Sequence, residues 1–154
     1  MFMHGGLFHL GGNMLYLWIF GNNIEDVLGH LRFLVFYLSC GIFAAYAHAL
    51  TSADSLIPMI GASGAVSGIL GAYLLLFPRA NVHTLIFLGF FITTVKIPAL
   101  IVIGFWAIIQ FINGLVSTGL DGGGGIAWFA HIGGFLIGLV TIKLWLPRRK
   151  RQWL

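Results

Sequence analysis

Charged side chains are scarce in this sequence of 154 residues: Asp, Glu, Lys and Arg together make up only 8% of it, whereas 59% is hydrophobic. Soluble domains average about 25% charged residues. So few charges cannot cover the water-exposed surface of a soluble protein of this length. The chain is therefore predicted to lie in lipid.

Cysteine is almost absent too, since Cys40 is the single one and lies within an apolar stretch. One cysteine excludes an internal disulfide framework and the CxxC motifs of metal and redox sites. We expect Cys40 to be a small packed apolar residue. The HExxH pattern of zinc proteases is missing as well.

Basic residues outnumber acidic ones, with eight Lys and Arg against four Asp and Glu. Half of the basic residues form the cluster 148–151, directly after an apolar run. A basic cluster in that place is typical of a cytoplasmic membrane flank. The charge therefore indicates the lipid bilayer as a partner, and no nucleic-acid partner is expected.

Five apolar runs reach the length of about 17–25 residues that a membrane-spanning helix needs. They cover residues 7–24, 33–51, 56–77, 98–116 and 125–146. The predicted fold class is all-α, a polytopic membrane helical bundle. Its transmembrane domain covers 1–147, and a basic cytoplasmic tail follows over 148–154.

Charge placement argues against a sixth span. With five spans every Lys and Arg falls on one side of the membrane, and Asp54 and Asp121 fall on the other. A sixth span over the shorter run 84–95 would place Arg32 and the tail on opposite sides. The positive-inside rule therefore predicts a cytoplasmic C-terminus and an interfacial or re-entrant position for 84–95.

The first span begins almost at Met1, with nothing before it that resembles a signal peptide. This abrupt start leads us to expect an upstream segment with one more helix.

Strongly polar groups within spans are costly in lipid and are therefore functional candidates. With the predicted topology, several of them share the outward-facing ends of the spans and could gather at one depth. They are His4, His9, Asn13, Ser63 and His131, with His48 towards the same side. The other polar residues within spans are Glu25, Ser67, Gln110 and Asn113.

Small residues recur every four positions in two of the spans, a pattern that lets helix backbones approach closely. These stripes are Gly64, Gly68 and Ala72 in one span and Ala130, Gly134 and Gly138 in the other. His131 shares a face with Gly134 and Gly138. If the stripes pack together, Ser63 and His131 come within the reach that a nucleophile and its base require.

Each of these residues also has a structural interpretation. A serine in a glycine-rich helix often bonds only a carbonyl of its own helix, and a lone membrane histidine often serves as a hydrogen-bonding or proton-pathway residue.

His9 and Asn13, four residues apart on one helical face, could supply donors for an oxyanion. The backbone N–H of Ser63 could add another, at the start of a helix. Alternatively, His9 and Asn13 join helices by polar contacts.

Taken together, three motifs are similar to those of the rhomboid intramembrane serine proteases. They are His4-x4-His9-x3-Asn13, Gly61-Ala62-Ser63-Gly64 and Ala130-His131-x2-Gly134-x3-Gly138. Further similarity lies in Gly21-x3-Glu25-x3-Gly29 and in Pro98 to Gln110 with Trp106. The resemblance covers essentially the whole chain.

The resemblance implies a dyad of Ser63 as nucleophile and His131 as general base. It implies that His9 and Asn13 stabilise the oxyanion, that His4 lines the cavity beside them, and that the structural residues are Glu25, Gly64 and Gly134. It further implies no cofactor and no metal, and transmembrane segments of other membrane proteins as substrates. The expected location is the bacterial cytoplasmic membrane.

Two departures from the family pattern affect the expected site. Only five spans of a six-span core are present, because the first helix and most of the following outer loop are missing. Ser67 also stands where some members have a tyrosine that packs on the catalytic histidine, so the orientation of His131 must come from another group. Asp121 is one alternative partner for it.

Two other functions stay open at this point. The first is an inactive rhomboid-like protein that binds transmembrane helices without cleaving them. The second is a transporter or metal channel that uses His4, His9 and His131, although the carboxylates expected along such a pathway are lacking.

Overall fold

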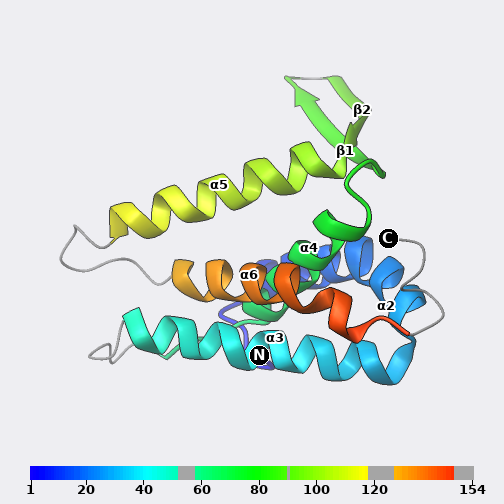
Figure 1. Ribbon diagram of the computed structural model, residues 1–154. Helices are drawn as coiled ribbons and strands as arrows, with labels where there is room; N and C mark the ends of the chain where they lie inside the picture. The colour runs from blue at the N-terminus through cyan, green and yellow to red at the C-terminus, as the bar shows by residue number, and fades with distance from the viewer. Residues whose placement is uncertain (52–57, 90, 118–126, 148–154) are drawn as a thin grey trace.

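The computed structural model describes residues 1–51, 58–89, 91–117 and 127–147, which form five helical rods and one β-hairpin. Figure 1 shows their arrangement. The first rod runs without a break through α1 (Leu7–Tyr16), the π-helical segment η1 (Leu17–Gly21) and α2 (Asn22–Leu28). The other rods are α3 (His30–Thr51), α4 (Ser63–Leu76), α5 (Ala99–Ser117) and α6 (Trp128–Trp145).

Each predicted span corresponds to one rod, and the predicted helical membrane bundle is confirmed. Among the described helices, α3, α5 and α6 are long and apolar enough to cross a membrane, whereas α4 is apolar but shorter. In the described part of the predicted run 56–77, the helix begins at Ser63, and Pro58 and Gly61 precede that residue in non-helical backbone. The basic tail 148–154 lies outside the described residues.

The basic residues that border the described helices lie at one end of the bundle, as the five-span prediction requires. In Figure 1 the beginnings of α3 and α5 and the ends of α4 and α6 all lie towards the right. Arg32, Arg79, Lys96 and Lys143 belong to these ends. Ser63 and His131 belong to the opposite ends of α4 and α6. Asp54 and Asp121 lie outside the described residues.

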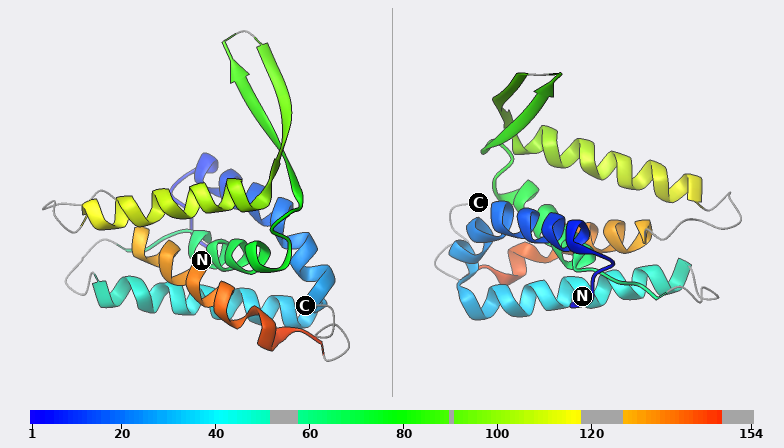
Figure 2. Two further views of the ribbon diagram at one scale, coloured as in Figure 1. Left: turned by 45° about the horizontal axis from the view of Figure 1, so that its top comes forward. Right: turned by 180° about the vertical axis from the view of Figure 1, so that it is seen from behind.

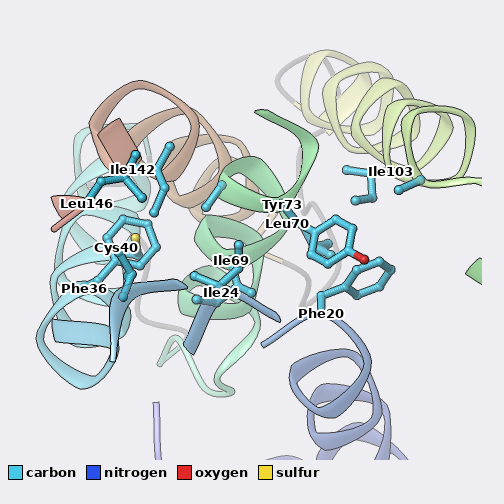
Figure 3. Packing of buried hydrophobic residues seen from close by; sticks show 13 residues of the cluster. Phe20, Ile24, Phe36, Cys40, Ile69, Leu70, Tyr73, Ile103, Ile142 and Leu146 are labelled. Carbon is cyan, nitrogen blue, oxygen red and sulfur yellow. The ribbon is translucent and has the colours of Figure 1, made fainter. Parts of the chain in front are cut away.

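Helix α4 is the central element, because every residue from Gly64 to Tyr73 is buried. Its second half meets large apolar side chains from the first rod, from α3 and from the end of α6 (Figure 3). These include Phe20, Ile24, Phe36, Ile142 and Leu146. The amide of Asn23 also donates to the hydroxyl of Tyr73, at 2.9 Å, and so links α2 to α4. The large side chains therefore fill the half of the bundle remote from Ser63.

Near Ser63 the packing depends on small residues instead. A Cβ atom added to Gly134 would overlap the carbonyl oxygen of Gly64, and one added to Gly138 would overlap that of Gly68. The backbones of α4 and α6 are thus in direct contact, which only glycine permits at these positions. The two small-residue stripes therefore pack together, which is the condition under which Ser63 and His131 were expected to meet.

The run 84–95 lies in a β-hairpin and not in a helix, so it forms no sixth helical span. Strand β1 (Asn81–Leu88) pairs antiparallel with β2 (Phe91–Pro98), and the hairpin extends away from the bundle (Figure 2). Its Val, Ile and Thr residues favour strands, and Gly89 adopts the positive φ of +63° that suits glycine in a turn. Open sheet edges are not tolerated in hydrocarbon, which favours the interfacial alternative over the re-entrant one.

Candidate active site

Ser63 is the first residue of α4, and the segment before it is held by the N-terminal residues of the chain. The N–H of Gly61 donates to the carbonyl of Met3 at 2.7 Å. The N–H of Ala62 donates to Nε2 of His4 at 3.4 Å. Gly61 has φ +105°, and a Cβ atom there would meet Nε2 of His9 at 2.6 Å, so both the backbone and the space require glycine.

His131 lies in the first turn of α6 and faces Ser63. Its Nε2 and the Ser63 Oγ are 2.7 Å apart, within the range of an O–H to nitrogen hydrogen bond. Gly64, which follows Ser63 by one residue, contacts Gly134, which follows His131 by three. The close approach of α4 and α6 therefore brings the two side chains into contact.

The other nitrogen of the His131 ring also has a partner. Nδ1 lies 2.7 Å from Oε1 of Gln110, a buried side chain of α5. The rings of Trp106 and Trp128 flank the imidazole, with centroids 6.2 and 6.3 Å from it. Among the described residues, a glutamine and two indoles thus surround the His131 ring, while the alternative partner Asp121 lies outside the described residues.

Sequence reasoning identified Gln110 as a polar group within a span but did not assign it to the site. The signal in the sequence was the cost of leaving the Gln110 amide without a hydrogen-bond partner in lipid, which makes a partner for this side chain necessary. Trp128 gave no such signal, because an aromatic residue near the end of a span is ordinary in membrane proteins.

A cavity of about 490 Å³ adjoins Ser63 and His131. His9 and Asn13 line it from the first rod, and Trp106 lines it from α5. Asn13 is buried, and its Nδ2 donates to the carbonyl of His9 at 2.9 Å. An amide nitrogen carries two N–H groups, so a second donor remains on Asn13 beside this bond.

The ring of His9 lies against Gly61. Its Nδ1 accepts the N–H of Gly5 at 3.4 Å, which leaves Nε2 as the protonated nitrogen of the neutral ring. That Nε2 and the Ser63 Oγ both border the space that a side chain at Gly61 would fill. His9 therefore presents a donor on the side of the nucleophile.

His4 was expected to line the cavity, but it is not among the residues that do so. It lies against the backbone before Ser63 instead, bonded to Ala62, and its ring meets that of His9 edge to face with centroids 5.3 Å apart. This position makes His4 a support for the start of α4.

The residues expected to be structural have structural contacts. Glu25 lies near the end of α2, and its Oε1 is 2.6 Å from Nδ1 of His30. The backbone carbonyl of Glu25 accepts the N–H of Gly29 at 2.7 Å. Gly64 and Gly134 form the backbone contact described above. In the part of the chain that the structure describes, no three His, Cys, Asp or Glu side chains lie close enough together to hold a metal ion.

Known proteins resemble this chain over most of its length. A family model for the rhomboid domain matches residues 1–148. Rhomboid protease GluP of Bacillus subtilis is 33% identical over 147 residues, which cover 95% of this chain and 25% of that protein. Rhomboid protein 1, mitochondrial, of Saccharomyces cerevisiae is 37% identical over 90 residues, 56% of this chain and 26% of that protein.

RHOMBOID-like protein 4 of Arabidopsis thaliana is 32% identical over 152 residues, which cover 99% of this chain and 34% of that protein. The chain thus spans between a quarter and about a third of the length of these three relatives. No solved structure gives a significant match. The match to the family model and the helical membrane bundle agree, and the chain belongs to the rhomboid family of integral membrane proteins.

Proposed function

We propose that this protein is an intramembrane serine endopeptidase that cleaves transmembrane segments of other membrane proteins through a dyad of Ser63 and His131. The observation that carries the proposal is the 2.7 Å contact between Ser63 Oγ and His131 Nε2 beside the cavity. The similarity to Rhomboid protease GluP of Bacillus subtilis supports the same reaction class.

The proposed reaction proceeds through an acyl-enzyme. Ser63 Oγ attacks the carbonyl carbon of the scissile peptide while its proton passes to Nε2 of His131. The imidazolium then gives this proton to the leaving amine, and the peptide C–N bond breaks. A water molecule, activated by the same imidazole, hydrolyses the ester and restores the Ser63 hydroxyl.

The negative charge on the tetrahedral intermediate needs hydrogen-bond donors in place before the reaction. We assign this role to the amide of Asn13 and to the Nε2–H of His9, which adjoin the cavity from the first rod. The backbone N–H of Ser63 is a third candidate, because the first N–H groups of a helix have no partner within it.

Asn13→Ala should lower kcat by about 10²- to 10³-fold, the usual loss when one oxyanion donor is removed, with little change in KM. Initial rates on a fluorescent transmembrane peptide in proteoliposomes measure both constants. Asn22→Ala, an exposed position in the same rod, is the matched control and should keep the rate. An unchanged kcat in Asn13→Ala would remove Asn13 from the mechanism.

The proposed site faces away from the cytoplasm. Ser63 and His131 lie at the bundle end opposite Arg32, Arg79 and Lys96, and positively charged ends of spans stay cytoplasmic. We therefore expect substrates to be cut near the outer face of the membrane, and the bacterial cytoplasmic membrane remains our expectation for its location.

Cleavage by the purified protein tests the proposal. Reconstituted with a reporter that carries one transmembrane helix, the wild-type protein should release a product whose mass places the cut within that helix. His131→Ala should be slower by several orders of magnitude, as after loss of the base in other serine hydrolases. Binding of the reporter without cleavage would overturn the proposal and support the alternative, an inactive protein that binds transmembrane helices.

A further inference from the structure

A dyad of this kind works only with one form of the imidazole. Nε2 must be unprotonated to accept the Ser63 proton, so the single proton of the neutral ring must sit on Nδ1. In a serine triad a buried aspartate enforces this tautomer by accepting from Nδ1–H. Ser63 and His131 need an equivalent acceptor at the other side of the ring.

Gln110 occupies that position. Its Oε1 lies 2.7 Å from Nδ1 of His131, and a carbonyl oxygen of an amide can only accept a hydrogen bond. The opposite orientation of the amide would present N–H to Nδ1 and force the proton onto Nε2. The direction of this one amide therefore decides whether His131 can act as a base.

The surroundings explain why an amide suits this place. An ionised carboxylate within a span costs much more to bury than a neutral amide. Gln110 is 7% exposed, and it provides an acceptor without adding a charge to the bilayer.

Helix α5 presents Gln110 to the bundle as part of a continuous face. Ala99, Ile103, Gln110 and Gly114 are the buried residues of α5, at spacings typical of one helical face. Trp106, one turn before Gln110, contacts both the His131 ring and Phe135 of α6. Residues that surround the imidazole thus also take part in the contact of α5 with α6.

We propose that Gln110 is a positioning residue of the Ser63–His131 dyad: it accepts from Nδ1–H and so holds His131 in the tautomer that can take the Ser63 proton. The expected effect of Gln110 on the rate rests on the proposed function. Its expected effect on the tautomer of His131 does not require any activity.

The first test is kinetic. Gln110→Leu keeps the approximate size and removes the acceptor, so kcat should fall by about 100-fold or more with little change in KM; the orienting aspartate of serine triads is worth about 10⁴-fold. Asn113→Leu, which removes another amide from α5, should keep most of the rate. Equal rates for Gln110→Leu and the wild type would overturn the inference.

The conservative variant separates positioning from packing. Gln110→Glu keeps an acceptor, so it should restore activity relative to Gln110→Leu. Its negative charge favours the imidazolium, so the acidic limb of the pH–rate profile should move to higher pH by about one unit or more. If Gln110→Glu is as slow as Gln110→Leu and its pH–rate profile is not displaced, the results contradict the idea that Gln110 acts through the imidazole.

The second test reads the imidazole directly. ¹⁵N NMR of histidine-labelled protein distinguishes the two tautomers, and the His131 signals are assigned by their loss in His131→Asn. In Ser63→Ala, which has no nucleophile, His131 should carry its proton on Nδ1, and adding Gln110→Leu should give a mixture. If Ser63→Ala already shows the Nε2-protonated form or a mixture, the inference is wrong whether or not the protein is a protease.

Discussion

Ser63→Ala should abolish covalent labelling of the membrane-embedded protein by a fluorophosphonate probe. Such a probe forms a bond only with a serine oxygen that a base has activated. Ser63 is the serine whose Oγ lies 2.7 Å from the imidazole of His131. The expected difference is complete loss of the labelled band, measured by in-gel fluorescence after equal protein loading.

Ser67 provides the matched control. It lies one turn later on the same helix, and its hydroxyl donates to the carbonyl of Ser63 at 2.6 Å. Because that hydroxyl is bonded to backbone and not to a base, Ser67→Ala should still be labelled. Equal labelling of wild type and Ser63→Ala would refute the assignment of the nucleophile, and loss of labelling in Ser67→Ala alone would transfer it to Ser67.

Gly134→Ala should destabilise the protein and also inactivate it. The added Cβ atom would overlap the carbonyl oxygen of Gly64, and a backbone atom within a helix cannot turn aside as a side chain does. Helices α4 and α6 must separate instead. Overpacking of this kind costs about 1–3 kcal/mol or more, and separation would lengthen the distance from Ser63 to His131.

Thermal unfolding in mild detergent and the rate of fluorophosphonate labelling measure the two effects. Gly104→Ala is the control, because a Cβ atom at Gly104 in α5 meets nothing within 4 Å. This change should be neutral or slightly stabilising, by up to about 1 kcal/mol, since alanine favours the helix. If Gly134→Ala behaves like Gly104→Ala, the helices are not held by this backbone contact.

The bundle could be predicted from the sequence because long apolar runs allow few structures in a bilayer. A chain in lipid must satisfy its own backbone, so each such run becomes a helix. The meeting of Ser63 with His131 followed from the small-residue stripes, since Gly64 and Gly134 have no side chains to keep the backbones apart.

Other features depended on information that no local pattern carries. The partner of Gln110 is set by the rotation of α5 against α6, which the packing of Trp106 on Phe135 helps to fix. The run 84–95 was too short for its apolar content alone to separate a strand from a helix. His4 was expected beside the cavity through family resemblance, whereas its bond to Ala62 depends on the path of residues before α1.

The contact of Gly64 with Gly134 has a consequence for how the proposed protease would respond to its surroundings. Two backbones in contact have no rotamers through which the contact can relax. The separation of the nucleophile from its base should therefore change little with temperature or with bilayer thickness. Any dependence of the proposed cleavage rate on the lipid should arise when a substrate enters, before the proton leaves Ser63.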